Sequence, residues 1–280
     1  ELFTTTFAST NRNMKYFFYS ALFITLLASC NDNNPKTPGN DNPTPGLSAP
    51  ATISYAILKN YPHDTTSFTQ GLSFYKGQFY EGTGNYGSSK LMEVDLATGK
   101  AKRSITLPKE FFGEGITILN DTVYQLTWKE KKVFAYTVKD FKKVKEFPIN
   151  TEGWGITTDG KSLIVSDGTS NLYYYEPATF QLLHTQMVTQ EGSPSFNLNE
   201  LEYIDGYIYA NQWQYPYIFK IEPGSGAIVG RIDLQQIWDR VKADDPHADV
   251  PNGIAHDTIT NKTYITGKNW PQLYEIEIGK

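Results

Sequence analysis

Hydrophobic and polar positions recur along this chain with a period of about 45 residues. Five short segments each have a polar residue or Trp, then usually Gly, then Leu or Ile: Gln70-Gly71-Leu72, Glu114-Gly115-Ile116, Trp154-Gly155-Ile156, Asn199-Glu200-Leu201 and Asn252-Gly253-Ile254. Their second positions are separated by 44, 40, 45 and 53 residues. After each segment come a turn and further short runs in which apolar and polar residues alternate, a pattern typical of β-strands.

Each repeat is expected to contain four strands. Beyond the initial segments, second strands are predicted at 77–81, 122–127, 162–166, 207–211 and 263–266, third strands at 91–96, 133–138, 172–176, 217–222 and 273–278, and fourth strands at 102–107, 143–149, 182–188 and 230–234. Four strands per repeat of this length predict an all-β fold, a five-bladed β-propeller. A β-sandwich is the competing architecture, but it does not explain a five-fold repeat.

Two further elements complete this prediction. The last repeat lacks a fourth strand, and the alternating segment from Thr52 to Lys59 can supply it, so that an N-terminal strand closes the ring and covers two strand edges. From Leu234 to Val241 the apolar residues recur at helical spacing. We therefore expect one short helix inserted in the loop between the fourth and fifth blades.

The composition agrees with an all-β fold that is held together by packing. The 19 Tyr, 16 Phe, 5 Trp and 22 Gly favour strands and tight turns. A single cysteine cannot form an internal disulfide, and the four histidines do not fall together in the repeat, so neither a metal site nor a cofactor is expected. The net charge of -5 argues against nucleic acid as the main partner.

The N-terminal region has the features of a bacterial lipoprotein. Met14 and Lys15 precede an apolar run over 16–28, and the Leu-Ala-Ser-Cys sequence that ends at Cys30 resembles a lipobox. Cys30 is therefore the predicted lipidation site. Asn31 follows it in place of the Asp that retains such proteins at the inner membrane, so the outer membrane or the periplasmic face of the cell envelope is favoured.

The chain accordingly divides into three predicted parts. Residues 1–29 are an upstream extension and signal peptide, residues 30–50 are the lipidated cysteine and a flexible linker rich in Asn, Pro, Gly and Asp, and residues 51–280 are the propeller. We expect a monomer that contacts the membrane through its lipid anchor only.

Polar residues are predicted to gather on one face of the ring. In each blade, the start of the first strand and the loop between the second and third strands open on the same face. The first of these places holds Gln70, Glu114, Trp154, Asn199 and Asn252, and the second holds Asn85, Tyr86, Trp128, Lys129, Asp167, Trp213, Lys268 and Trp270. This face should carry one carboxylate at the channel mouth, several amides, a lysine and a group of indoles.

Each of these residues also has a structural interpretation. A Trp commonly packs between blades, Asn252 can satisfy the backbone of a turn, and Ser166-Asp167-Gly168 is itself typical of a turn. Polar residues nevertheless occupy equivalent positions in different blades while differing in type. Because structural positions in a repeat tend to keep their residue type, this pattern favours a functional site.

Motifs on this face occur in order through all five blades. They are His63-Asp64, Phe68-Thr69-Gln70-Gly71-Leu72, Phe112-Gly113-Glu114-Gly115, Leu126-Thr127-Trp128-Lys129, Glu152-Gly153-Trp154-Gly155, Asn199-Glu200-Leu201-Glu202-Tyr203, Ala210-Asn211-Gln212-Trp213 and Thr266-Gly267-Lys268-Asn269-Trp270-Pro271. Over residues 54–278 the chain resembles the glutaminyl cyclases of plant and bacterial type, which are five-bladed propellers unrelated to the zinc-dependent animal enzymes.

The resemblance implies an enzyme that converts the N-terminal glutamine of peptides or proteins to pyroglutamate and releases ammonia without a metal. It implies that Glu114 is the general acid/base and that Asn199 and Lys268 are its catalytic partners. The substrate-binding residues that it implies are Phe68, Gln70, Phe112, Trp128, Trp154 and Trp213.

The residues themselves support this chemistry. The attacking amine and the amide carbon belong to one glutamine, so the enzyme has to fold the side chain back and move protons, and it needs no nucleophile of its own. A single carboxylate suffices for that task. Two alternatives remain open: a non-catalytic surface propeller that binds peptides or glycans, and a glycosidase that uses Glu114 with Asp167.

Overall fold

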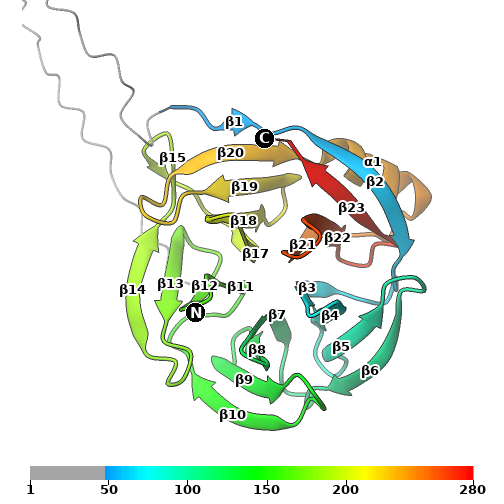
Figure 1. Cartoon of the computed structure of the whole chain (residues 1–280), viewed down its shortest axis with the longest axis vertical. Helices are drawn as coiled ribbons and strands as arrows, with labels where there is room; N and C mark the ends of the chain where they lie inside the picture. The colour runs from blue at the N-terminus through cyan, green and yellow to red at the C-terminus, as the bar shows by residue number, and fades with distance from the viewer. Residues whose placement is uncertain (1–47, 280) are drawn as a thin grey trace, which may run out of the picture. The chain divides into compact units, whose positions relative to one another are not determined.

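Five sheets surround a central axis in the computed structural model, which describes residues 48–279 (Figure 1). Blades one and two consist of β3 (Thr69–Tyr75), β4 (Gln78–Thr83), β5 (Lys90–Asp95) and β6 (Lys100–Thr106), and of β7 (Gly113–Leu119), β8 (Thr122–Thr127), β9 (Lys132–Thr137) and β10 (Lys143–Pro148). Blade three consists of β11 (Ile156–Thr158), β12 (Leu163–Ser166), β13 (Asn171–Tyr175) and β14 (Leu182–Met187). The four strands of each of these three blades are antiparallel, and they follow one another outward from the axis in chain order.

Blades four and five complete the predicted propeller. Blade four has β17 (Leu198–Ile204), β18 (Tyr207–Gln212), β19 (Tyr217–Ile221) and β20 (Ile228–Asp233), and blade five has β21 (Pro251–Asp257), β22 (Lys262–Gly267) and β23 (Gln272–Ile278). The outermost strand of blade five is β2 (Tyr55–Pro62), which pairs antiparallel with β23 (Figure 1). Closure of the ring by an N-terminal strand is thus confirmed.

The N-terminal segment differs from the prediction in its bounds. Residues 51–52 form a separate strand, β1 (Ala51–Thr52), which pairs parallel with β20 of blade four. Ile53 then packs onto Gly230, and the chain crosses from blade four to blade five before β2 begins. Alternation of residues identifies a strand but not its partner, and so one predicted strand became two.

A short hairpin of β15 (Thr189–Gln190) and β16 (Ser193–Pro194) was not predicted, because two-residue strands have no detectable period.

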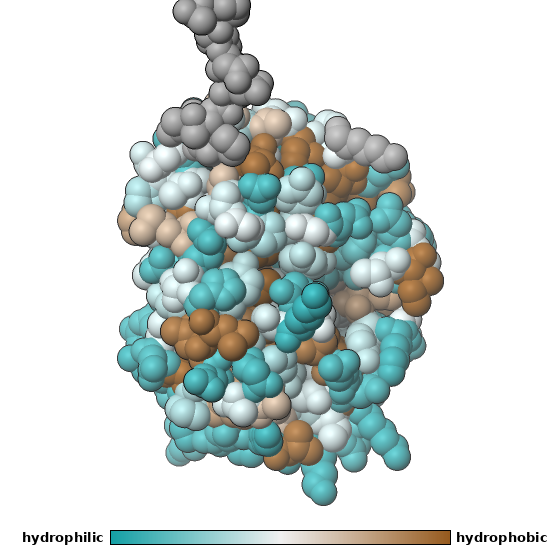
Figure 2. Space-filling model, turned by 60° about the vertical axis from the view of Figure 1, so that its left-hand side comes forward, coloured by the Kyte–Doolittle hydropathy of each residue, from teal (hydrophilic) through white to brown (hydrophobic). Residues whose placement is uncertain are grey.

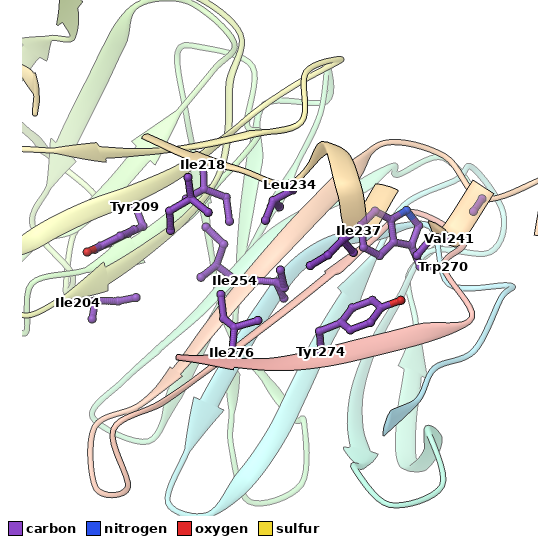
Figure 3. Close-up of a cluster of buried hydrophobic side chains, with 13 residues drawn as sticks. Ile204, Tyr209, Ile218, Leu234, Ile237, Val241, Ile254, Trp270, Tyr274 and Ile276 are labelled. Carbon is purple, nitrogen blue, oxygen red and sulfur yellow. The ribbon is translucent and has the colours of Figure 1, made fainter. Parts of the chain in front are cut away.

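The predicted helix is present as α1 (Gln235–Asp244). Its buried residues Ile237 and Val241 pack beside Trp270 and Tyr274 (Figure 3). Within residues 48–279, no helix has the length and apolar character of a membrane span.

The hydrophobic core is divided into five clusters, each between two neighbouring blades. Trp270 belongs to the cluster between blades four and five, where it is fully buried and its indole N–H donates to the carbonyl oxygen of Asp249. It is therefore a packing residue, and the expectation that it faces the channel was wrong.

On the side of the propeller that includes blade three, hydrophobic side chains form small separate patches among hydrophilic ones (Figure 2).

The innermost strands approach one another closely around the axis. A Cβ atom at Gly71 would lie 2.4 Å from the backbone nitrogen of Ile116, and one at Gly155 would lie 2.0 Å from the carbonyl oxygen of Asn199. This crowding explains the glycine at the second position of most repeats. Blade four has Glu200 there, and its buried carboxylate accepts hydrogen bonds from the backbone N–H groups of Leu72 and Ile254.

The predicted signal peptide, the lipidation site Cys30 and most of the predicted linker lie outside the described residues.

Candidate active site

Irregular pairing at the start of the innermost strands directs the site residues. In β3, β7, β17 and β21 the register with the next strand shifts at the first two positions of the repeat. Such a β-bulge redirects a side chain that regular alternation would place elsewhere. The shifts include Gln70, Glu114, Asn199 and Asn252, so the same local irregularity is built into four blades.

The channel mouth contains a pocket of about 330 Å³. Its lining residues are Phe68, Gln70, Asn85, Phe112, Glu114, Trp128, Trp154, Asn199, Trp213, Asp249 and Lys268. All nine predicted catalytic and substrate-binding residues are therefore brought together from five blades. Asp249 was not predicted. It lies in the loop between α1 and β21, which is outside the two sets of positions that the repeat identifies.

Glu114 and Lys268 are the two buried charged residues of the pocket, which Asp249 also lines. Each of these two residues is only 5% exposed. Burial raises the pKa of the Glu114 carboxyl well above its ordinary value, and the nearby carboxylates Glu152 and Glu130 add to this effect against the opposing charge of Lys268. Burial likewise lowers the pKa of the Lys268 ammonium. Burial thus raises the pKa of the acid and lowers the pKa of the base, which brings the two pKa values closer together.

Lys268 is held in place by the backbone and by an aromatic ring. Its N–H donates to the carbonyl oxygen of Val250, its own carbonyl oxygen accepts from the N–H of Asp249, and its Nζ lies 4.6 Å from the centre of the Phe68 ring. The two loops that carry Phe68 and Lys268 are also linked, since the N–H of Asn269 donates to the carbonyl oxygen of Ser67. These contacts fix the backbone of Lys268 and place its ammonium group against the Phe68 ring.

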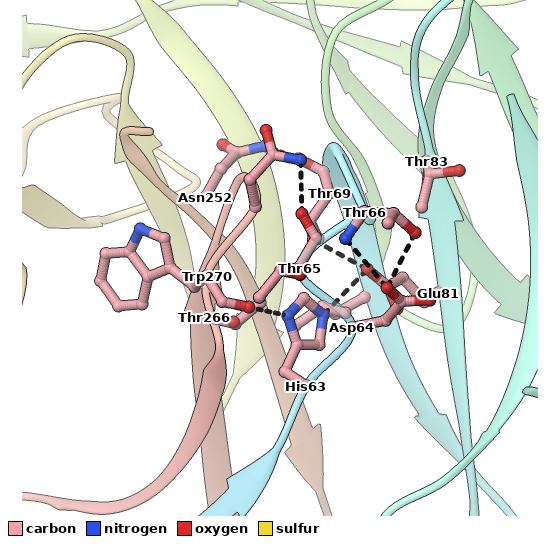
Figure 4. Close-up of polar contacts among 12 residues, drawn as sticks. His63, Asp64, Thr65, Thr66, Thr69, Glu81, Thr83, Asn252, Thr266 and Trp270 are labelled. Atoms are coloured by element: carbon pink, nitrogen blue, oxygen red, sulfur yellow. Dashed lines mark hydrogen bonds and ion pairs between the residues drawn. The ribbon is translucent and has the colours of Figure 1, made fainter. Parts of the chain in front are cut away.

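A buried histidine supports the same loop from behind (Figure 4). The Nδ1 atom of His63 lies 2.7 Å from the carbonyl oxygen of Trp270, and its Nε2 atom lies 3.1 Å from the carboxylate of Glu81. Burial alone would lower the pKa of His63, but the Glu81 carboxylate raises it above its ordinary value. The hydroxyl group of Thr69 donates to the same carboxylate oxygen, which ties this support to the strand of Gln70.

The two buried amides of the pocket, Gln70 and Asn199, differ in their surroundings. The Gln70 side-chain oxygen accepts from the Nδ2 atom of Asn252, which also donates to the carbonyl oxygen of Thr69. Asn252 is fully buried and does not line the pocket, so its structural interpretation is the right one. The buried Oδ1 atoms of Asn199 and Asn252 both lack a hydrogen-bond partner within residues 48–279, but only Asn199 lines the pocket. A ligand in the pocket can supply the donor that Asn199 lacks.

The remaining wall of the pocket is aromatic. Phe112 packs edge to face against Phe68 and Trp128, with ring centres 6.2 and 5.5 Å apart. The indole rings of Trp154 and Trp213 form a second edge-to-face pair at 5.4 Å. Such a wall excludes water, and the faces of indole rings attract a cationic group such as a protonated amine.

Comparisons with known proteins point to one family. The family model described as glutamine cyclotransferase matches residues 23–278. The chain belongs to the glutamine cyclotransferase family. It is 39% identical over 226 residues to the glutaminyl-peptide cyclotransferase of Arabidopsis thaliana, an alignment that covers 79% of this chain and 70% of the relative. Its fold matches the crystal structure of Myxococcus xanthus glutaminyl cyclase with a TM-score of 0.78 at 33% identity, covering 82% of this chain and 98% of the other.

In this glutamine cyclotransferase, one carboxylate outside the predicted site organises the aromatic wall. The same oxygen of Glu152 accepts hydrogen bonds from the indole N–H groups of Trp128, at 2.8 Å, and Trp154, at 3.1 Å. These two indoles come from different blades, so Glu152 joins the two halves of the wall. The sequence shows Glu152 two residues before Trp154, but no pattern reveals that both indoles turn toward it.

Asp167 does not join Glu114 in the pocket of this family member. One oxygen of its carboxylate accepts from Thr169, and the other accepts from the hydroxyl group of Tyr173 at 3.0 Å. Asp167 is thus a turn residue and is not the second acid that the glycosidase alternative requires. Within residues 48–279, no group of three or more His, Cys, Asp or Glu side chains is arranged to hold a metal ion.

Proposed function

We propose that this protein is a glutaminyl cyclase, which converts the N-terminal glutamine of a peptide or protein to pyroglutamate and releases ammonia. The observation that carries this proposal is a buried carboxylic acid, Glu114, that shares a small aromatic pocket with Lys268. The names of the Arabidopsis relative and the Myxococcus structure support the same reaction.

In the proposed reaction the glutamine folds back in the pocket, and its α-amine attacks the carbon of its own side-chain amide. Glu114 takes a proton from the attacking nitrogen and gives it to the departing amide nitrogen, which leaves as ammonia. Lys268 stabilises the negative charge that develops on the amide oxygen. The free Oδ1 atom of Asn199 accepts a hydrogen bond from a substrate N–H and holds it in the folded conformation.

We further propose that this reaction needs no metal. The substrate supplies both reacting groups, and the described residues supply a proton acceptor and a cation for the oxyanion. The test is to incubate the purified protein with a Gln-initiated peptide in the presence of EDTA. Ammonia release and a mass loss of one ammonia per peptide are expected. Loss of turnover in EDTA, and its return with added metal, would contradict the proposal.

A non-catalytic propeller is the second candidate, because an aromatic pocket of this kind also suits a binding protein. It predicts that the folded protein binds a Gln-initiated peptide or a glycan without any change in the mass of the peptide. The same incubation distinguishes the two, since binding can be followed by the quenching of tryptophan fluorescence and turnover by mass spectrometry.

We also propose that the protein is a monomer anchored in the cell envelope by a lipid on Cys30. The lipobox-like sequence before Cys30 and the polar segment after it support this location. In a bacterial host, the full chain should incorporate a labelled fatty acid and fractionate with membranes. The Cys30→Ala variant should lose both properties, and a labelled Cys30→Ala protein would disprove lipidation at this residue.

A further inference from the structure

A second hollow is lined by residues that neighbour pocket residues in the chain. This groove has a volume of about 580 Å³. One side is the chain segment that contains the β15–β16 hairpin and leads into β17, and the other is the loop between β18 and β19. Both segments also contribute to the pocket, because the first leads directly to Asn199 and the second contains Trp213. The same two chain segments therefore contribute residues to the groove and to the pocket.

Hydrogen bonds fix the two sides of the groove to each other. The N–H of Trp213 donates to the carbonyl oxygen of Asn197 at 2.8 Å, and the side chain of Gln212 donates to the carbonyl oxygen of Phe196 at 3.2 Å. Asn197 and Gln214 both have left-handed backbones, with φ of 65° and 69°. Asn adopts this conformation readily, whereas it is uncommon for Gln.

The groove presents two aromatic side chains to solvent. Phe196 is 56% exposed and Tyr215 is 47% exposed, whereas most other aromatic side chains of the propeller are buried or half-buried. The ring of Tyr215 is held parallel to that of Tyr217, at an angle of 8° and a distance of 6.4 Å. The groove lining includes the carboxylate of Glu191 and contains no lysine or arginine. Apart from the Phe196 and Tyr215 rings and Pro194 the lining is polar, so the groove suits a side chain that packs on the rings, or a cationic one, better than an acidic one.

The proposed reaction uses only the first residue of its substrate, so the rest of the peptide has to leave the pocket along some surface. An extended peptide advances about 3.4 Å per residue, and its third to fifth residues reach well beyond the pocket mouth. We propose that the groove is a subsite for these residues and that it favours an aromatic or aliphatic side chain over an acidic one. This inference rests on the proposed function of the pocket.

The test compares Gln-initiated peptide amides of two and five residues, with Phe or Glu at the third and fourth positions of the longer ones. The wild type should convert the longer Phe peptide with a kcat/KM roughly three- to tenfold above that of the dipeptide, mainly through a lower KM. The longer Glu peptide should lack this gain. The double variant Phe196→Ser/Tyr215→Ser should lose the gain and convert the dipeptide as the wild type does.

The matched control is Tyr86→Ser, which removes an exposed aromatic side chain from blade one at the other side of the pocket. It should keep the preference for the longer Phe peptide. The proposal is wrong if the wild type shows no gain with length, if the double variant retains the gain, or if Tyr86→Ser abolishes it. In those cases dipeptide turnover still supports the proposed function. If no peptide is converted, the proposed function fails, and the subsite fails with it.

Discussion

Two buried carboxylates at adjacent positions of the repeat have opposite surroundings. Glu114 occupies the first position in blade two, and Glu200 occupies the second position in blade four. Burial raises the pKa of both carboxyls well above the ordinary value. Glu200, however, bridges two backbone N–H groups from blades one and five, whereas Glu114 faces a pocket that also contains a lysine.

Burial and a raised pKa therefore do not by themselves identify a catalytic acid. What distinguishes Glu114 is that its pocket leaves room for a reacting group, while both oxygens of Glu200 already have partners in the backbone. Glu200 acts as a structural link across the channel, and Glu114 is placed to exchange a proton. The predictions that follow separate these two roles.

The largest effect is expected from the same substitution at both positions. Glu114→Gln should lower kcat by about a hundred- to ten-thousand-fold and leave the melting temperature nearly unchanged, because it removes the proton carrier and keeps the shape. Glu200→Gln should keep kcat and reduce the free energy of unfolding by about 1–3 kcal/mol, since its NH₂ group would face a backbone donor. Ammonia release and thermal denaturation measure the two effects. Equal losses of activity in both folded variants would contradict the distinction.

Lys268→Met should have the next largest effect. It removes the cation opposite Glu114 and should lower kcat by about a hundredfold, within the range observed when an oxyanion contact is lost. Because the lysine lowers the pKa of Glu114, its removal should also move the acidic limb of the pH–rate profile to higher pH. A lower kcat with an unmoved limb would show that the two groups are not coupled.

Glu152→Gln should produce a smaller change of opposite sign. The amide oxygen can still accept from the indoles of Trp128 and Trp154, but the negative charge that raises the pKa of Glu114 is gone. The acidic limb should therefore move to lower pH, with kcat at its optimum reduced by no more than about threefold. Glu152→Ala serves as the control, because it should also loosen the aromatic wall and raise KM. An acidic limb that stays at its wild-type position in Glu152→Gln would argue against a role for the charge.

The smallest effect is expected within the channel at Glu202, two residues from Glu200. Burial raises the pKa of Glu202 to about 8. A carboxyl whose pKa is raised by folding stabilises the protein fully below its unfolded pKa, and this contribution disappears as the pH rises through the folded value. Wild-type stability should thus fall between about pH 4.3 and pH 8, and Glu202→Gln should flatten this decline. Thermal denaturation at several pH values measures it, and parallel curves would disprove the effect.

The sequence predicted the five blades because a glycine or an aliphatic residue recurs where the inner strands crowd together. It also predicted the pocket residues, since two sets of loops must share one face. The links formed by Glu152 and Glu200 depend on the direction of side chains, which a repeat does not specify. Glu200 did carry a signal, because it stands where most blades have glycine. The parallel pairing of β1 was beyond reach, because two residues contain no pattern.

Ring closure by β2 also constrains how the protein folds. Tyr55 pairs with Ile278, so the last blade is assembled from segments separated by more than two hundred residues. Contacts of such long sequence separation form slowly, because a large loop has to close before they contribute any stability. Blades one to three and the antiparallel strands of blade four can form from local contacts while the chain is still being synthesised. The completed ring, and with it the Lys268 side of the pocket, has to wait for the final strands.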